Sequence, residues 1–463
     1  MNDRLSPSDM SSLLAERGSI HVHVGATLIV EGEPPSFERL LEHVDARLAL
    51  VPRFRQRITP ATLNLSNPSW SEDTEFELGR HVRHSALPAP GSMAQLRDYV
   101  GRLMSEPLDL QRPLWQLYLI EGLEGGRHAV VSKTHHALVD GVSAVDVGTI
   151  LLDPNPEGTE IELPPAGAEP DETAPGLLFP RSAPRAIREA LRTAREAATE
   201  TAREAIAIPR EAASTVIKTA EGFASLATEA PSCPPSALNV EIGRDRRVAF
   251  ARAELDAIKA ARGGSGATVN DVILSIVTGG LREFLAGRGD EVPEQLVALV
   301  PVSIRRPEES GELGNRISTI LVPLPLLAEN PGQRLRIVRE RTSRLKESEQ
   351  ARASALIVQA SGWTPPTINR LISGALARPR VFNLVVSNVP GPQMPFYLLG
   401  NRLAEVYPFV PLSPQGHALS IGVLSYDGSV FFGLAGDRDA VPDLDELARC
   451  ITDAVARQTA VAA

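Results

Sequence analysis

Hydrophobic residues recur at two spacings along the chain, and each spacing predicts one type of element. Between Ser36 and Val51 the apolar residues follow helical spacing behind a serine that can cap the first turn, which predicts a helix. Residues 21–30 and 127–135 alternate or run continuously apolar, which predicts half-buried strands. The same patterns predict strands at 296–304, 317–324, 381–388, 418–426 and 429–436, and helices at 142–152 and near 268–286, 331–350, 365–377 and 442–457.

Strands and helices mix in both halves of the chain, which predicts an α/β protein in which each half is a mixed sheet with packed helices. The 463 residues also exceed what one hydrophobic core normally supports. An acidic, Pro-rich stretch after Asp153 has little to bury and reads as an exposed connection. We therefore expect domains at 1–154 and 236–463, joined by a linker at 155–235.

The second part of this linker, residues 180–230, is rich in Ala, Arg and Glu. Pairs such as Arg185 and Glu189, four positions apart, favour a helix that Pro209 should kink or end. Two interpretations stay open. The helix either lies on the protein between the domains or touches a lipid surface through its Ala, Ile and Phe face.

Charge and composition narrow the classes of partner. A formal net charge of −10 argues against nucleic acid, because a phosphate backbone needs a basic face. Cys233 and Cys450 fit no zinc or disulfide spacing, and the N-terminus has no apolar signal segment, so a cytoplasmic protein is expected. The longest uncharged stretch, 381–401, holds three prolines and three asparagines and cannot be a spanning helix. Any membrane contact should therefore be peripheral.

The chemistry of the chain is concentrated in THHALVDG, residues 134–141, at the end of the predicted strand 127–135. Neighbours on a strand point to opposite faces, so His135 and His136 cannot easily share a metal ion, and no metal is expected. A Ser-hydrolase motif G-x-S-x-G is absent from the sequence. Two interpretations remain: a structural strand end, or one histidine that acts as a general base while the other packs.

The pattern His-His-x-x-x-Asp-Gly resembles the signature of the CoA-dependent acyltransferase and condensation-domain superfamily. Further segments resemble the motifs of the bacterial wax ester synthase/diacylglycerol acyltransferase (WS/DGAT) family, and they occur in the expected order over nearly the whole chain. An ordered set of this kind is far more specific than any one member. The segments are LSPSD at 5–9, HVG at 23–25, PLW at 113–115, ND at 270–271, SNVPGP at 387–392 and SYDG at 425–428.

The resemblance implies two domains similar to chloramphenicol acetyltransferase, with an active-site tunnel at their interface. His136 would be the base that deprotonates a hydroxyl as it attacks the thioester of acyl-CoA, with both substrates bound together. The acceptor would be a fatty alcohol, giving wax ester, or diacylglycerol, giving triacylglycerol. Acyl-CoA is then a substrate and no cofactor is needed. Burial of each methylene contributes about 0.8 kcal/mol, which favours long chains and peripheral contact with a membrane or lipid droplet.

The resemblance also implies supporting residues around the base. His135 would support His136, Asp140 would brace the turn, with Arg305 or Arg306 as its partner, and Gly141 permits the tight backbone there.

The other motifs keep two interpretations each. Pro113, Leu114 and Trp115 either pack in the core or also border the acyl channel. Asn270 and Asp271 either cap a helix or form a wall of the active site. Ser387 and Asn388 open a rigid turn whose function is implied by the family alone.

Two other functions are compatible with parts of this pattern. A condensation-type enzyme that joins carrier-bound substrates shares the histidine signature, but it would not be expected to carry the PLW and SNVPGP segments. A non-catalytic protein that binds stored neutral lipid would not need the histidine base. The sequence does not indicate an oligomeric state.

Overall fold

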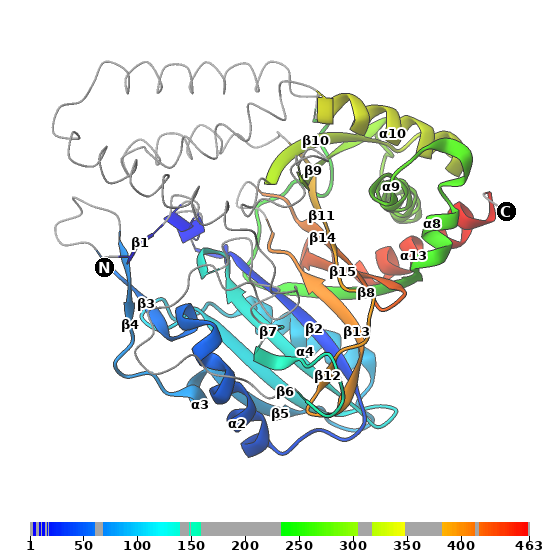
Figure 1. Cartoon of the computed structure of the whole chain (residues 1–463). Coiled ribbons are helices and arrows are strands. Elements are labelled where there is room, and N and C mark those ends of the chain that lie inside the picture. The colour runs from blue at the N-terminus through cyan, green and yellow to red at the C-terminus, as the bar shows by residue number, and fades with distance from the viewer. Residues whose placement is uncertain are drawn as a thin grey trace, which may run out of the picture.

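Two six-stranded sheets with helices on their faces make up the body of the protein (Figure 1). A small sheet of β1 (Asp3–Arg4), β4 (Ser69–Glu72) and β3 (Gln56–Thr59) lies beside the first of them. The computed structural model describes residues 3–5, 9–10, 12–13, 16, 18–60, 68–138, 148, 150–158, 233–303, 317–347, 382–412 and 416–461.

The first sheet has the strand order β12-β13-β2-β7-β6-β5, with β5 parallel to β6 and the other pairs antiparallel. Its strands are β2 (His23–Glu31), β5 (Val82–Ala86), β6 (Trp115–Leu123), β7 (Arg127–His135), β12 (Tyr397–Leu398) and β13 (Asn401–Phe409). The helices of this part are α2 (Phe37–Arg47), α3 (Leu78–His81) and α4 (Met93–Ser105), with the short 3-10 turns η1 (Leu48–Leu50), η2 (Pro52–Arg55) and η4 (His136–Leu138).

The second sheet has the order β10-β9-β11-β14-β15-β8, in which β11 runs parallel to both of its neighbours. Its strands are β8 (Arg246–Glu254), β9 (Gln295–Ser303), β10 (Ile317–Pro325), β11 (Leu384–Pro390), β14 (Leu419–Tyr426) and β15 (Ser429–Asp437). The helices of this part are α8 (Leu255–Ala260), α9 (Val269–Arg288), α10 (Pro331–Glu347) and α13 (Leu444–Ala460), with the turn η5 (Gly263–Ser265).

The elements read from hydrophobic spacing are present where the structure describes them. Ser36 caps α2, because its side chain accepts a hydrogen bond from the amide of Arg39, as the helix pattern predicts. The strands expected at 127–135, 296–304, 418–426 and 429–436 match β7, β9, β14 and β15 within one residue at each end. The helix expected near 365–377 and most of 142–152 lie outside the described residues.

Strands β8 and β13 are among those that had no counterpart in the sequence predictions. Strand β13 comes from the second half of the chain but pairs with β2 of the first sheet, where Leu403 lies opposite Val30. The predicted domain limits 1–154, 155–235 and 236–463 stay a prediction. The first sheet contains strands from both predicted domains, because β12 and β13 belong to it. Almost all of the predicted linker, including its helix at 180–230, lies outside the described residues.

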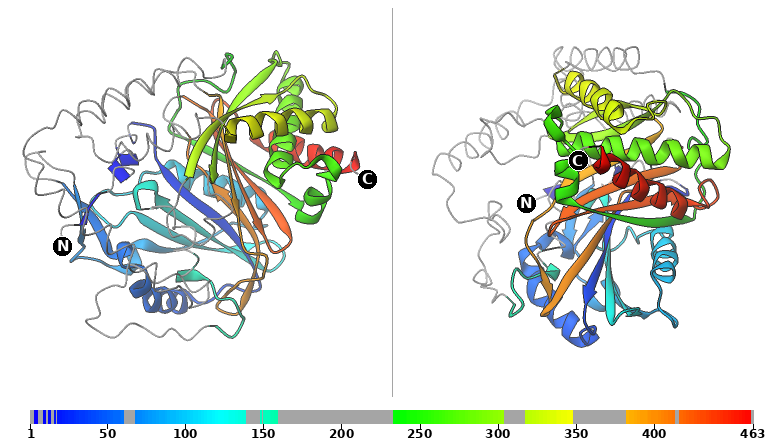
Figure 2. Two further views of the ribbon diagram at one scale, coloured as in Figure 1. Left: turned by 45° about the horizontal axis from the view of Figure 1, so that its top comes forward. Right: turned by 90° about the vertical axis from the view of Figure 1, so that its right-hand side faces the viewer.

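The two sheets share a core because β13 of the first sheet packs against β14 and β15 of the second (Figure 1; further views in Figure 2). The ring of Tyr407 in β13 stacks on Phe250 of β8, with ring centres 4.1 Å apart, and meets the edge of Phe431 in β15. On the opposite face, the second sheet buries its apolar side chains against α9, α10 and α13. The second sheet is therefore covered on both faces, which suits its parallel strand β11.

A buried histidine in this second part of the chain should make stability depend on pH. The ring of His417 stacks on Phe382 at 3.8 Å, and burial lowers its pKa to about 4. An unfolded histidine titrates near pH 6.5, so between pH 6.5 and 4 the unfolded state takes up a proton that the native state does not. We expect the free energy of unfolding to fall across this window, with His417 contributing on the order of 2 kcal/mol.

The measurement is denaturant unfolding at a series of pH values. His417→Leu should flatten the slope between pH 6.5 and 4 relative to the wild type. An equal slope in wild type and His417→Leu would contradict the assignment.

Among the described helices, none combines the length and the apolar character that crossing a bilayer requires.

Candidate functional site

His135 and His136 mark the point where β7 ends and the turn η4 begins. The amide of His135 donates to the carbonyl of Leu114 at 2.9 Å, and that of His136 donates to the carbonyl of Val22 at 2.8 Å. These bonds tie the pair to both neighbouring strands. The side chain of His135 is fully buried, whereas His136 is exposed. Nδ1 of His136 lies 3.5 Å from the hydroxyl of Ser12. One histidine therefore packs and the other reaches the surface, the arrangement that the general-base interpretation requires.

The hydrogen bonds of His135 determine which of its nitrogens carries the proton. Nδ1 accepts from the amide of Ala137 at 2.9 Å, so Nε2 must carry the hydrogen and donate to Oε2 of Glu16 at 2.8 Å. Burial by itself would raise the pKa of Glu16, but the imidazole of His135, followed by that of His21, outweighs it and lowers this pKa to about 2. Glu16 is thus an ionised carboxylate that holds His135 in one tautomer. Sequence reasoning missed it, because it lies 119 residues from its partner.

Lys133 is a second group that the sequence did not single out. It is fully buried on the face of the first sheet that carries His135, two positions away along β7. Its ammonium donates to the carbonyl of Leu103 at 2.6 Å and to the carbonyl of Glu106, at the C-terminal end of α4. Burial lowers the pKa of Lys133 to about 8. A cation here satisfies carbonyls that the end of a helix leaves without partners.

The HVG segment owes its glycine to the close approach of β2 and β7. A Cβ at Gly25 would lie 2.1 Å from the carbonyl oxygen of Ser132, which no side chain can tolerate. The glycine therefore lets β2 run tightly along the strand that ends at His135, opposite His23.

The PLW segment packs in the core and supports the histidines through its backbone. Leu114 and Trp115 are buried, and the indole nitrogen of Trp115 donates to the carbonyl of Phe54 at 2.7 Å. The ring of His81 stacks on Trp115 at 4.8 Å, and its Nδ1 hydrogen-bonds to the carbonyl of Trp115 at 2.9 Å. These contacts agree with the packing interpretation. Whether the segment also borders an acyl channel stays a prediction.

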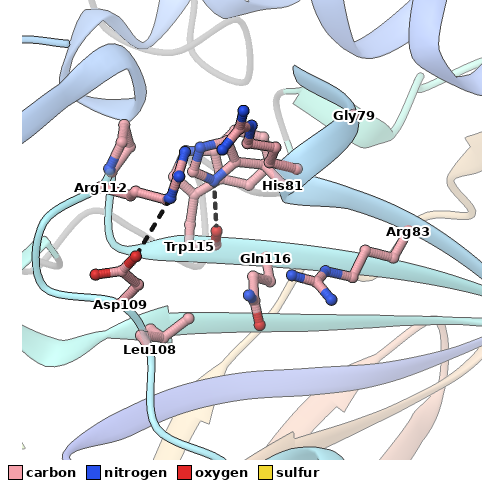
Figure 3. Close-up of a pocket in the computed structure, with 10 residues that line it drawn as sticks. Gly79, His81, Arg83, Leu108, Asp109, Arg112, Trp115 and Gln116 are labelled. Carbon is pink, nitrogen blue, oxygen red and sulfur yellow. Dashed lines mark hydrogen bonds and ion pairs between the residues drawn. The ribbon is translucent and has the colours of Figure 1, made fainter. Parts of the chain in front are cut away.

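A cavity of about 500 Å³ opens beside this tryptophan (Figure 3). Three arginines line it, and two of them pair with carboxylates, Arg80 with Glu77 and Arg112 with Asp109. Arg83 has no ion pair among the described residues. The cavity therefore has an excess of positive charge. Its lining comprises Gly79, Arg80, His81, Arg83, Leu108, Asp109, Arg112, Pro113, Trp115 and Gln116.

The ND and SNVPGP segments meet where the start of α9 contacts β11 of the second sheet. The side-chain amide of Asn388 in β11 donates to Oδ1 of Asn270 at the start of α9, at 3.1 Å. Asp271 forms a capping box with Thr268 and accepts a hydrogen bond from the hydroxyl of Thr342 at 2.6 Å. Its contacts are those of the helix-cap interpretation.

The remaining residues of SNVPGP form a turn that rests on the SYDG hairpin. Ser387 is half-buried in β11, opposite Gly422 of β14. The amide of Gly391 donates to the hydroxyl of Ser425 at 3.2 Å, and a Cβ at Gly391 would lie only 2.3 Å from the carbonyl oxygen of Ser425. The close approach at Gly391 requires a residue without a Cβ there, and the rigidity that the Pro and Gly content predicts stays a prediction.

Several predicted site residues cannot be placed. Asp140 and Gly141, and the suggested partners Arg305 and Arg306, lie outside the described residues.

Comparison with known proteins decides the family. The model of the wax ester synthase/diacylglycerol acyltransferase catalytic domain matches residues 5–273, and that of the WS/DGAT C-terminal domain matches residues 313–457. The chain belongs to the wax ester synthase/diacylglycerol acyltransferase family. The expected resemblance is confirmed, and the protein is an acyltransferase.

Its relatives match over almost their full length. The probable diacylglycerol O-acyltransferase tgs1 of Mycobacterium tuberculosis is 32% identical over 464 residues, covering 99% of this chain and 96% of the relative. The probable diacylglycerol O-acyltransferase tgs2 of the same species is 33% identical over 463 residues, covering 96% of each.

Solved structures confirm the fold of this acyltransferase. The WS/DGAT of Marinobacter aquaeolei VT8 is 28% identical, with a TM-score of 0.67 over 99% of both chains. The starter condensation domain of rhizomide synthetase has the same fold, with 14% identity and a TM-score of 0.57 over 100% of this chain and 94% of that chain. The predicted α/β fold with two domains similar to chloramphenicol acetyltransferase is therefore confirmed.

Proposed function

We propose that this acyltransferase moves a long-chain acyl group from acyl-CoA to the hydroxyl of diacylglycerol, giving triacylglycerol. The names of the mycobacterial relatives favour diacylglycerol as the acceptor, and the wax ester synthase named in Marinobacter aquaeolei makes a fatty alcohol the second candidate. The observation that carries the proposal is the position of His136. It is the exposed member of the histidine pair, at a strand end whose backbone is tied on both sides.

In the proposed reaction, His136 acts on the acceptor while both substrates are bound. Its imidazole takes the proton of the hydroxyl as the oxygen forms a bond to the thioester carbonyl carbon. The carbon–sulfur bond then breaks, and the imidazolium returns the proton to the CoA thiolate. General-base assistance of this kind contributes about 10²–10⁴ in rate, and positioning of the substrates supplies more. The active-site tunnel that the family resemblance implies between the two domains would hold both substrates in this reaction.

The test supplies purified protein with palmitoyl-CoA and either diacylglycerol or a long-chain alcohol. The amount of free thiol released and the amount of ester formed, which chromatography measures, should rise together. Both should require an acceptor. Thiol release without ester would identify a thioester hydrolase instead. If neither acceptor supports release, the relatives' reaction does not extend to this chain.

The positively charged cavity beside Trp115 is a candidate site for the phosphates of acyl-CoA. Trp115 pairs with Thr134, two positions before His136, so the cavity lies at the same end of the sheet as the proposed base. Guanidinium groups are well suited to phosphate oxygens. We expect Arg83→Ala to raise the KM for palmitoyl-CoA several-fold with little change in kcat, and the wild-type KM to rise with salt. Steady-state kinetics at two salt concentrations check this.

Arg449→Ala is the matched control, because Arg449 is an exposed arginine on α13 in the second part of the chain. An unchanged KM in Arg83→Ala would place the phosphates elsewhere.

Glu16 should act as a positioning residue, through His135 and the turn that presents His136. Glu16→Ala leaves the Nε2 hydrogen of a buried His135 without an acceptor, so kcat should fall at least tenfold while the KM for palmitoyl-CoA changes little. Glu16→Gln retains an oxygen acceptor and should recover much of the loss. The assay is run with chelator-treated protein. Equal activity of both variants and wild type would show that the carboxylate only packs.

The lipid substrates imply peripheral contact with a membrane or lipid droplet. Co-flotation of the protein with phosphatidylcholine vesicles containing diacylglycerol would support such contact. Recovery of the protein only in the bottom fraction, without the vesicles, would argue against such contact.

A further inference from the structure

Three side chains that the proposed reaction does not require as ligands converge beside the buried histidine. Glu16, His21 and His23 each offer one metal-ligating atom, and these atoms all lie within 4.8 Å of one another. Oε1 of Glu16 is 3.4 Å from Nδ1 of His21 and 3.7 Å from Nε2 of His23. In the part of the chain that the structure describes, no other group of three such residues converges in this way.

The ring nitrogens of this cluster that lie buried have no hydrogen-bond partners. His23 is fully buried, yet neither of its ring nitrogens has a hydrogen-bond partner, and Nδ1 of His21 is also without one. Buried polar atoms in that condition cost free energy and call for an explanation, such as an ion. An unpartnered nitrogen of a fully buried imidazole faces the carboxylate of Glu16 here.

The spacing suits a shared metal ion better than direct hydrogen bonds. Zinc binds imidazole nitrogen and carboxylate oxygen at about 2.0–2.2 Å in a tetrahedral shell, which puts neighbouring ligand atoms about 3.3–3.6 Å apart. The two separations from Glu16, 3.4 and 3.7 Å, lie close to that value. Two histidines and one glutamate are also a known zinc ligand set with a fourth position for water.

The fold holds these ligands in a fixed arrangement. His21 and His23 stand two positions apart where β2 begins, so they point to the same face, and their rings stack with centres 5.4 Å apart. The other carboxylate oxygen of Glu16, Oε2, accepts the hydrogen of His135. Outer hydrogen bonds of this kind orient metal ligands and are part of most metal sites.

The charged groups around the cluster indicate which ion would suit it. Glu16 is the carboxylate of the cluster, and Lys133 lies two positions before His135 on β7. Lys133 is the cation that opposes a second positive charge, and the carbonyls of Leu103 and Glu106 engage its ammonium. The carboxylate of Glu16 compensates one charge of a divalent ion. The two imidazole ligands favour transition metals such as zinc over calcium or magnesium, which prefer oxygen ligands.

We propose that Glu16, His21 and His23 form a binding site for a divalent transition metal of the zinc class. The bound ion would fasten the segment before β2 to the sheet beneath His135, and would thereby stabilise the native protein. The site was not expected from the sequence, where the metal question concerned the neighbours His135 and His136.

The test titrates chelator-treated full-length protein with Zn²⁺ by calorimetry and with Co²⁺ by visible absorption. We expect one ion per chain, a tetrahedral Co²⁺ spectrum, and a Tm that rises by a few degrees with saturating zinc. His21→Gln and His23→Leu should lose all three effects. His84→Gln, at an exposed histidine remote from the cluster, should keep them.

His21→Gln is the decisive variant, because His21 is less buried than His23 and its replacement should fold with a near-normal metal-free Tm. Zinc binding by His21→Gln with wild-type affinity would overturn the proposal, as would the absence of a saturable site in the wild type. Thiol release from palmitoyl-CoA is measured separately. Turnover without zinc binding would refute the metal site alone.

Discussion

Replacement of His136 by alanine should reduce ester formation from palmitoyl-CoA by about 10²–10⁴-fold, the usual contribution of a general base. The loss should be in kcat, because the methyl group cannot take the acceptor's proton. His136 is exposed, so its side chain contributes little packing and the variant should unfold at nearly the wild-type Tm. The measurement is the rate of thiol release with diacylglycerol present, together with thermal unfolding.

His84→Ala is the matched control, since it also removes an exposed imidazole from the first sheet. Its rate should equal that of the wild type. If His136→Ala still forms ester at the wild-type rate, another group removes the proton. If neither the wild type nor the variant forms ester but both bind neutral lipid, the non-catalytic lipid-binding alternative is the better account.

Asp153→Leu should lower the free energy of unfolding by about 3–5 kcal/mol, because it leaves a buried guanidinium without its carboxylate. Arg47 of α2 donates to Asp153 at 2.8 Å, and both side chains are more than nine-tenths buried. Arg47 also donates to His43, whose Nε2 bonds the carbonyl of Leu151 at 3.0 Å. Urea unfolding monitored by circular dichroism measures the change.

The double variant Arg47→Met, Asp153→Leu should regain most of the lost stability, since two apolar side chains can replace a buried pair without leaving a lone charge. A surface pair provides the comparison, because Glu77→Gln beside exposed Arg80 should have little effect. A loss below about 1 kcal/mol in Asp153→Leu would mean that water reaches Arg47 and that the pair is not a buried one.

These two predictions concern opposite ends of the first sheet. Tyr397 pairs with Arg402, which lies next to the Leu403–Val30 pair, whereas His135 pairs with His23 at the other end of β2. Asp153 follows the histidine motif along the chain, and its backbone exchanges hydrogen bonds of 2.8 Å with Tyr397 of β12. The turn that presents His136 is thus followed by a segment fastened to α2 on one side and to the edge of the sheet on the other. Loss of the buried pair should lower activity only in proportion to the unfolded fraction.

The sequence by itself determined the local elements and the identity of the proposed base. Helix α2 and strand β7 follow from spacing, because which side chains share a face depends on the period of the backbone alone. The order of short motifs was enough to predict the family, and through it the fold. Local rules also anticipated that one histidine of the pair would pack while the other reached the surface, as His135 and His136 do.

Only the tertiary structure decided which distant groups meet. Strand β13 enters the first sheet beside β2, Glu16 binds His135 across 119 positions, and Asn270 meets Asn388 across 118. Lys133 looks like an ordinary strand residue until α4 places its last carbonyls over it. No periodicity records such contacts, because they depend on how sheets and helices pack once the chain has folded. The carboxylate that sets the tautomer of the buried histidine therefore became visible only in three dimensions.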